Sequence, residues 1–179
     1  MKDEFDVDVE WLPFELHPEI PPEGMELPYH IRAQFGGMSK RLEQLALDAG
    51  MQMTIPNRIP NSRRSLEESE YAREQGKHEA FHHTVFQKFY GEGLDMSDWE
   101  VLRSAAEEIG LDPDDLQQKT DSGQYKAVVD TYFSQAKAIG ITGVPTYILD
   151  NNYAIVGAQP YEIFRQAMER LGYPSHPTK

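Results

Sequence analysis

The sequence of 179 residues contains no cysteine. Disulfides, thiolate nucleophiles and thiolate metal sites all need the Cys sulfur, so we expect no thiol-disulfide chemistry from this chain alone. Long apolar runs are absent too, and the first residues, Met-Lys-Asp-Glu-Phe-Asp, contain no hydrophobic signal core. The sequence therefore predicts no membrane span and no export, and we expect a cytoplasmic protein.

Basic residues are scarce. Seventeen Lys and Arg stand against 30 Asp and Glu, which gives a formal net charge of −13. Such a surface repels phosphate backbones and anionic lipid, so nucleic acid and membrane are excluded as expected partners. The length, with 39% hydrophobic and 11% aromatic residues, fits one globular domain with a single core.

The N-terminal part alternates apolar and acidic residues from Phe5 to Trp11, a period of two that predicts a strand over Val7–Trp11 with one wet face. Prolines and glycines between residues 13 and 37 predict an irregular surface stretch. A short amphipathic helix is expected next, capped by Ser39 and ended by Gly50.

A block of helices is predicted from residue 65 to residue 139. Ser65 with Glu68, and Ser97 with Glu100, have the spacing of capping boxes, and Asp112-Pro113 is typical of a helix start. The first helix is expected to bend near Gly76. The apolar stripe from Tyr125 to Ile139 is the strongest in the chain and predicts a buried helix.

The period changes after Gly140. Two runs rich in β-branched and aromatic residues, 146–149 and 153–156, are separated by Asp-Asn-Asn, which predicts a hairpin whose turn uses left-handed conformations. Pro160 then begins a last amphipathic helix that Gly172 ends.

Several motifs resemble one known family. The segment Gly143-Val144-Pro145-Thr146, followed by the hairpin and the last helix, is similar to the cis-proline loop of the thioredoxin superfamily. The segments at 9–18, 58–62 and 72–77 (VEWLPFELHP, RIPNS and AREQGK) narrow the resemblance to DsbA-like thiol-disulfide oxidoreductases of the FrnE type, relatives of kappa-class glutathione transferases and hydroxychromene-carboxylate isomerases. The resemblance runs from about Asp6 to Leu171.

The resemblance implies an α/β, thioredoxin-like fold: one DsbA-like domain over residues 1–179, with a large helical insertion at about 38–138. Family members carry a strand, a Cys-x-x-Cys motif and its helix before the strand that we place at Val7. Only six residues precede Val7, whereas a βαβ unit needs about 30. We therefore expect the N-terminal βα segment to be missing. A lost segment, a trimmed start and supply by another chain remain open.

The candidate site is the loop Gly143, Val144, Pro145 and Thr146. In the superfamily a cis bond before the proline exposes the preceding backbone to an extended peptide or to glutathione, so the resemblance implies a cis Val144-Pro145 bond and one of these ligands. The simpler interpretation is a proline that ends a loop before a strand. We expect no catalytic residue and no cofactor.

Two polar clusters allow a functional and a structural interpretation. His78, His82 and His83 share a helix, but a solvated face is the simpler interpretation because no third ligand has a recognisable spacing, so no metal is expected. Arg58, Arg63 and Arg64 fit either a glutathione carboxylate or a helix start that balances nearby glutamates. Trp11, Trp99 and the stripe from Phe81 to Phe89 are expected in the core.

Three functions follow as hypotheses. We favour a redox-inactive relative of the DsbA/FrnE oxidoreductases that keeps a peptide-binding cis-proline loop. The second is a glutathione-dependent isomerase or transferase, in which a Ser commonly replaces the first active-site Cys; that Ser would also lie in the missing segment. The third is a non-catalytic partner-binding module. A sheet that lacks a central strand exposes two edges, so we also expect a homodimer.

Overall fold

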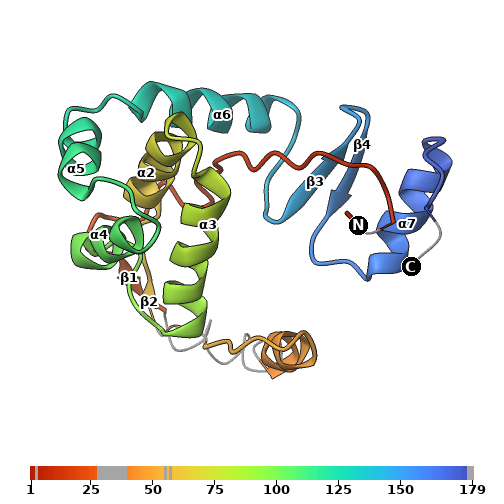
Figure 1. Ribbon diagram of the computed structural model, residues 1–179, viewed down its shortest axis with the longest axis horizontal. Helices are drawn as coiled ribbons and strands as arrows, with labels where there is room; N and C mark the ends of the chain where they lie inside the picture. Colours follow the sequence, from red (N-terminus) through yellow and green to blue (C-terminus); the bar gives the residue numbers. More distant parts are fainter. Residues whose placement is uncertain (3, 28–39, 55, 57, 177–179) are drawn as a thin grey trace.

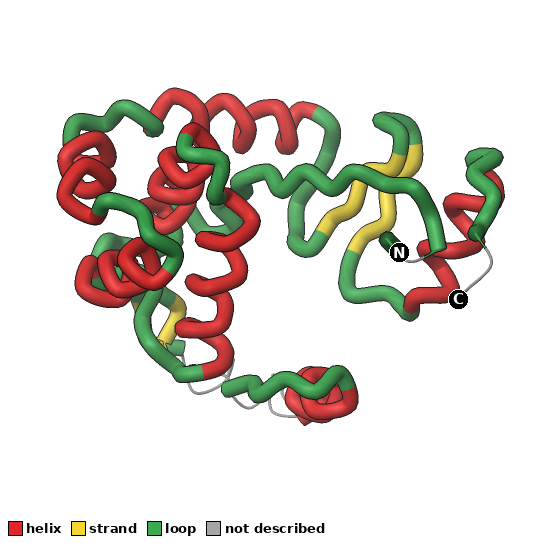
Figure 2. The backbone as a smooth tube through the Cα atoms, viewed as in Figure 1, coloured by secondary structure: helices red, strands yellow, loops and turns green. Residues whose placement is uncertain are grey.

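The computed structural model describes residues 1–2, 4–27, 40–54, 56 and 58–176. It has two lobes (Figures 1 and 2). Helices α2 to α6 form one lobe, and a hairpin with the last helix forms the other. Helix α6 and an N-terminal extended segment run between the two lobes. The Val144–Pro145 loop lies where α6 leads into the hairpin.

The helices follow the predicted block in outline. A helix covers residues 40–48, so the predicted cap Ser39 lies outside the described residues. The others are α2 (Arg63–Glu74), α3 (His78–Phe86), the π-helix η1 (Gln87–Gly91), α4 (Trp99–Glu108), α5 (Pro113–Asp121), α6 (Lys126–Ala138) and α7 (Tyr161–Arg170). Gly76, at φ 69°, separates α2 from α3, where the sequence predicted a bend.

The predicted capping boxes are wrong, for a local reason. Helix α2 begins two residues before Ser65, whose hydroxyl donates to the carbonyl of Ser62, and Glu68 pairs with Arg64 inside the helix. Helix α4 is capped by Asp98, which accepts from the amide of Glu100. In α4 the carboxylate of Asp98, one residue nearer to the first helical turn than Ser97, takes the place of the Ser97 hydroxyl as the cap acceptor.

The predicted start at Asp112-Pro113 is confirmed. The Asp112 carboxylate accepts from the amides of Asp114 and Asp115, and Pro113 is at the first helical position. There the missing proline N–H costs nothing, because the first-turn amides have no partner within the helix.

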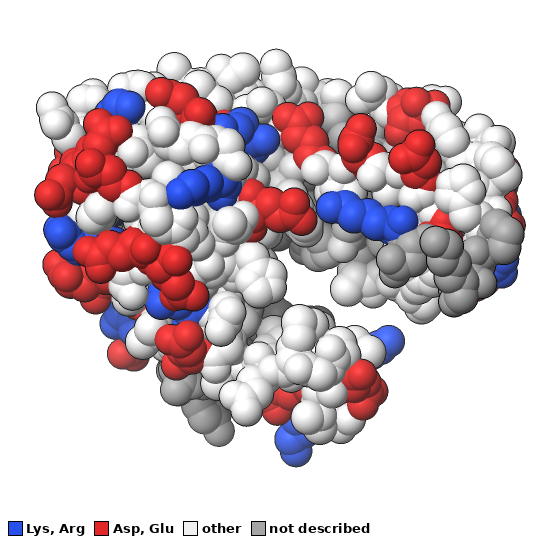
Figure 3. Space-filling model, in the orientation of Figure 1, with Lys and Arg blue, Asp and Glu red and all other residues white. Residues whose placement is uncertain are grey.

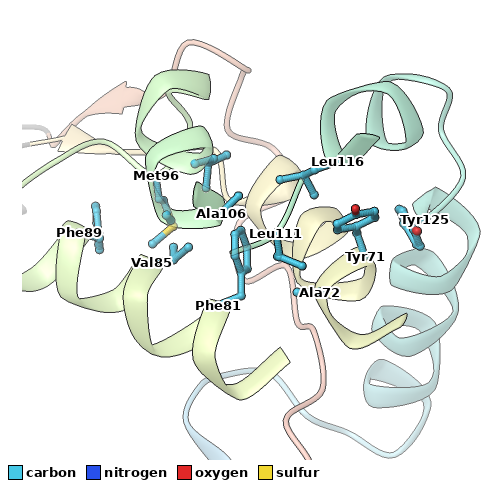
Figure 4. Packing of buried hydrophobic residues seen from close by; sticks show 12 residues of the cluster. Tyr71, Ala72, Phe81, Val85, Phe89, Met96, Ala106, Leu111, Leu116 and Tyr125 are labelled. Carbon is cyan, nitrogen blue, oxygen red and sulfur yellow. The ribbon is translucent and has the colours of Figure 1, made fainter. Parts of the chain in front are cut away.

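The main core lies inside the helical lobe (Figure 4). Phe81, Val85 and Phe89 of α3 and η1 are buried, as predicted, and Trp99 packs against the cluster. Phe86 and Trp11 are exposed instead. Phe81, Val85 and Phe89 recur every fourth residue on one side of the helix, and Phe86 lies on another side.

Among the residues that the structure describes, four short strands make two separate ladders. Strands β3 (Thr146–Leu149) and β4 (Tyr153–Val156) form the predicted antiparallel hairpin, and Asp150 and Asn151 in its turn have φ of 52° and 53°. Strand β1 (Met25–Glu26) lies in the stretch predicted to be irregular and pairs with β2 (Arg58–Ile59). Gly24 permits this approach, because a Cβ there would lie 3.0 Å from the carbonyl oxygen of Ile59.

Two predicted elements differ in the structure. Residues 7–11 form no strand; within the described residues no backbone–backbone hydrogen bond joins residues 6–14 to another segment. Helix α6 is largely exposed, and Val129 is its one fully buried residue. The alternating pattern of residues 7–11 is local, whereas a strand also needs a neighbouring strand to pair with. The apolar stripe of α6 gives the apolar side of the helix but not the length over which other elements cover it.

Candidate binding site at the Val144–Pro145 loop

The candidate site begins where α6 ends and β3 begins. The Val144–Pro145 peptide bond is cis, the isomer that the resemblance implies. Two hydrogen bonds fix the loop. The amide of Gly157 donates to the Pro145 carbonyl over 2.8 Å, and the Thr146 hydroxyl donates to the Gly143 carbonyl over 2.7 Å. The four predicted residues therefore make one compact turn that is tied to the end of β4.

Val144 lies at the exposed point of this turn. Its residue surface is 51% exposed, and within the described part of the chain no hydrogen bond engages its amide N–H or its carbonyl. A backbone donor and acceptor without partners next to a strand are the groups that pair with an added extended chain. The turn can therefore hold a polypeptide backbone through hydrogen bonds.

Strand β3 continues this free backbone. In the described residues β3 pairs only with β4, so its other edge has no partner strand. The hairpin is anchored on one face, where Ile155 is buried with Phe164 and Ala167 of α7, and where Tyr147 packs edge-on against Phe164 with 4.8 Å between ring centroids. The free edge therefore belongs to a fixed strand, which carries no charged side chain.

Gly157 is a residue of the site that sequence reasoning did not single out. Its amide holds the Pro145 carbonyl, and its φ of 82° is in the left-handed region that favours glycine. A signal was present, because Gly157 directly follows the second predicted strand of the hairpin. Thr146 pairs with Val156, so Pro145, which precedes Thr146, lies beside Gly157, which follows Val156.

The arginine cluster is satisfied within the protein. Arg63 contacts Glu67 at 2.5 Å, Asp130 at 2.6 Å and Glu15 at 3.3 Å. These carboxylates raise the pKa of its guanidinium although burial acts in the opposite direction. Helices α2 and α6 and the N-terminal segment are joined at this one side chain.

The other two arginines of the cluster are engaged as well. Arg64 pairs with Glu68 at 2.9 Å and with Asp121 at 2.8 Å. Arg58 donates to the carbonyl of Glu23 over 2.5 Å. The cluster therefore agrees with the structural interpretation, a helix start whose arginines balance nearby carboxylates. Its guanidinium groups already bind acceptors within the protein, so they are not free to bind a glutathione carboxylate.

The histidines of α3 take part in ring contacts. His78 and His82 stack with centroids 6.2 Å apart, and burial together with neighbouring positive charge lowers the pKa of both. Among the described residues no three His, Asp or Glu side chains gather in a way that would hold a metal ion. In the same residues no helix has the length and apolarity needed to cross a membrane.

Comparison with known proteins places these features in a family context. The profile of the DSBA-like thioredoxin domain matches residues 1–169. The uncharacterized protein YwbO of Bacillus subtilis is 30% identical over 166 residues, which cover 91% of this chain and 82% of that protein. A 2-hydroxychromene-2-carboxylate isomerase of Sphingobium xenophagum is 33% identical over 85 residues, 45% of this chain and 42% of the isomerase.

Similar solved structures include the following two. The crystal structure of a probable DsbA oxidoreductase, SCO1869 of Streptomyces coelicolor, aligns with a TM-score of 0.78 and 25% identity, and covers 93% of this chain and 76% of that chain. A 2-hydroxychromene-2-carboxylate isomerase aligns with a TM-score of 0.70 and 23% identity, over 79% of this chain and 69% of the other. The second likeness concerns the fold alone.

Proposed function

The chain belongs to the DSBA-like thioredoxin domain family and has its thioredoxin-like fold, and from this premise we propose that it is a redox-inactive polypeptide-binding protein. It binds an extended peptide at Gly143, Val144, Pro145 and Thr146. The observation that carries the proposal is the unengaged backbone of Val144 at the free edge of β3. The absence of Cys from the 179 residues supports the lack of disulfide exchange, which requires a thiolate.

Binding is expected to add a strand to β3. The Val144 N–H and C=O pair with the peptide backbone, so the affinity depends little on the peptide side chains. The probe is an uncharged acetylated pentapeptide, Thr-Val-Thr-Val-Thr amide, added to the ¹⁵N-labelled chain. We expect saturable NMR shifts at the amides of Val144, Thr146 and Ile148. Shifts confined to other segments, or no saturation at millimolar peptide, would contradict the proposal.

A pair of matched variants sharpens this test. Val144→Asp places a carboxylate beside the binding backbone and should weaken the peptide at least fivefold. Val156→Asp puts the same charge on another exposed valine, at the end of β4, and should change the affinity less than twofold. Equal losses in the two variants would assign the effect to charge in general.

The second candidate is a glutathione-dependent isomerase or transferase, which the partial match to the isomerase of Sphingobium xenophagum favours. It predicts saturable glutathione binding at the same loop. The peptide proposal predicts none, since Arg58, Arg63 and Arg64 already hold internal acceptors. In an insulin-reduction assay with dithiothreitol we expect the rate of the protein-free blank. The cytoplasmic location stays a prediction.

A further inference from the structure

An aromatic surface lies on α3, separate from the Val144–Pro145 loop. His78, His82, Phe86 and Tyr90 follow one another every fourth residue; the His82 and Phe86 centroids are 4.3 Å apart, and those of Phe86 and Tyr90 are 5.5 Å apart. Trp11, from the N-terminal segment, stacks on His82 at 4.5 Å. We call Trp11, His82 and Phe86 the aromatic platform.

The platform faces solvent. Trp11 is 42% exposed and Phe86 is 44% exposed, whereas Phe81 and Val85 on the other side of the same helix are buried in the core. Val9 and Leu12, next to Trp11 in the extended segment, are exposed as well. Adjoining exposed apolar side chains of this kind mark interaction sites more often than single ones do.

Acidic residues neighbour the platform residues along the chain. Asp6, Asp8 and Glu10 are exposed on the segment that carries Trp11, and Glu79 is exposed on α3. The nearby cations are occupied: Arg73 contacts Glu70, Glu10 and the Trp11 carbonyl, and Lys2 lies 3.6 Å from Glu79. Burial lowers the pKa of His82, with the charges of His78 and His83 acting in the same direction, so its ring is neutral near pH 7.

We propose that the aromatic platform binds a basic segment of another protein, in which Lys or Arg residues alternate with apolar ones. Its cations lie over the exposed rings of Trp11 and Phe86 and beside Asp8 and Glu10, and its apolar side chains cover Val9 and Leu12. The acidic charge next to the platform favours a basic partner over other kinds. A second copy of the chain would bring its own net charge of −13 against the acidic rim, and a nucleic acid would bring phosphates.

Space for such a segment exists beside α3. Figure 3 shows an open hollow between the helix of residues 40–48 and the lobe of β3, β4 and α7, and α3 runs along its side in Figure 1. This surface does not use the Val144–Pro145 loop, so the proposal stands or falls independently of the proposed function.

The test uses the whole chain and an acetylated, amidated 12-residue peptide of alternating Lys and Phe. The chain has two tryptophans, so ¹⁵N labelling gives two indole N–H signals. We expect the Trp11 signal to shift saturably and the Trp99 signal, from the core side, to stay. Added salt should weaken binding because the acidic rim is solvent-exposed. The same peptide with Glu in place of Lys should bind at least tenfold more weakly.

Matched variants test whether the peptide binds at the aromatic platform. Phe86→Ser should weaken binding at least tenfold, whereas Ile163→Ser, at an apolar residue of α7 that is 40% exposed, should change it less than twofold. The double variant Asp8→Asn, Glu10→Gln should lose about fivefold, a fold-change of the size that rim charges produce. The double variant Asp114→Asn, Glu100→Gln removes the same charge from other exposed positions, on α5 and α4, and should lose less than twofold.

Several outcomes would overturn the proposal. They are equal binding of the Glu peptide, no shift of the Trp11 indole at millimolar peptide, and equal effects of Phe86→Ser and Ile163→Ser. A doubled mass in light scattering that Phe86→Ser abolishes would assign the platform to a second copy instead. A melting curve for each variant separates a lost surface from a lost fold.

Discussion

Glu68 is a fully buried carboxyl group whose ionisation should weaken the fold. Its side chain in α2 has no exposed surface, and its Oε2 atom has no hydrogen-bond partner in the described chain. Burial raises the pKa of Glu68 to about 8, and the Asp121 and Glu67 charges add to the effect, although Arg64 opposes it. Arg64 also forms an ion pair with Asp121 at 2.8 Å, so Glu68 and Asp121 share one guanidinium group.

The sign and size of the effect follow from proton linkage. An unfolded Glu has a pKa of 4.5, so between pH 4.5 and 8 the folded chain binds the proton more tightly than the unfolded chain does. The stabilisation from protonated Glu68 is complete below pH 4.5 and is lost as the pH rises to 8. Each pH unit in this window is worth about 1.4 kcal/mol, so by pH 7 the loss is about 3 kcal/mol.

The variant Glu68→Gln removes this pH dependence, because the amide has the shape of the protonated acid and never ionises. Urea unfolding should show the variant gaining about 3 kcal/mol relative to the parent between pH 4.5 and 7. Glu107→Gln, which removes an exposed carboxylate paired with Arg103, is the control for a Glu→Gln change outside the buried site and should not give this gain. Taking differences cancels the titration of all other groups that the two proteins share.

A spectroscopic measurement tests the same reasoning without a stability assay. The carboxyl ¹³C signal that is absent from the Glu68→Gln protein belongs to Glu68, and in the parent its titration midpoint should lie near pH 8. A midpoint near 4.5, or a free-energy difference that stays constant from pH 4.5 to 8, would refute the reasoning.

Two further predictions concern the side chains that hold the N-terminal segment. Arg63→Met leaves the buried Glu15 and Glu67 without their cation and should cost about 3 kcal/mol in urea unfolding. Arg165→Met, on the exposed face of α7, should cost far less, and equal costs would contradict the stabilising role of Arg63. Burial lowers the pKa of His78 and His82 below 6.5, so the unfolded chain binds these protons more tightly, and the contribution of the two histidines to the unfolding free energy should fall as the pH drops below 6.5, opposite in sign to that of Glu68. Relative to the parent, His82→Asn should therefore gain unfolding free energy as the pH drops from 7.5 to 5.5, and the absence of such a gain would contradict this account.

Local signals in the sequence predicted the fold best. The hairpin turn at Asp150 and Asn151 and the cap at Asp112 depend on residues within a few positions of each other, and both are as predicted. Residues 7–11 fail as a strand because a strand depends on a distant partner. The burial of α6 was overestimated, since spacing gives the apolar side of a helix but not the length over which it is covered.

The candidate site was predicted in position but not in its chemistry. The motif around Pro145 located the loop, whereas the unengaged N–H and C=O of Val144 are a property of the folded backbone that no residue type reports. The platform shows the same limit. The four-residue spacing of His78, His82 and Phe86 was visible in the sequence, but Trp11 lies 71 positions from His82 and is brought there by the path of the N-terminal segment.

Helix α6 is a spacer of fixed length between the two lobes. Its 13 residues span about 20 Å, and each residue adds about 1.5 Å and a turn of about 100°. Its first part is fixed to α2 through Arg63, and residues 139–142 connect its last turn to the Val144–Pro145 loop. One inserted residue would therefore rotate the hairpin by more than a quarter turn while moving it only slightly. An inserted or deleted residue in α6 would therefore change the direction in which the free edge of β3 points.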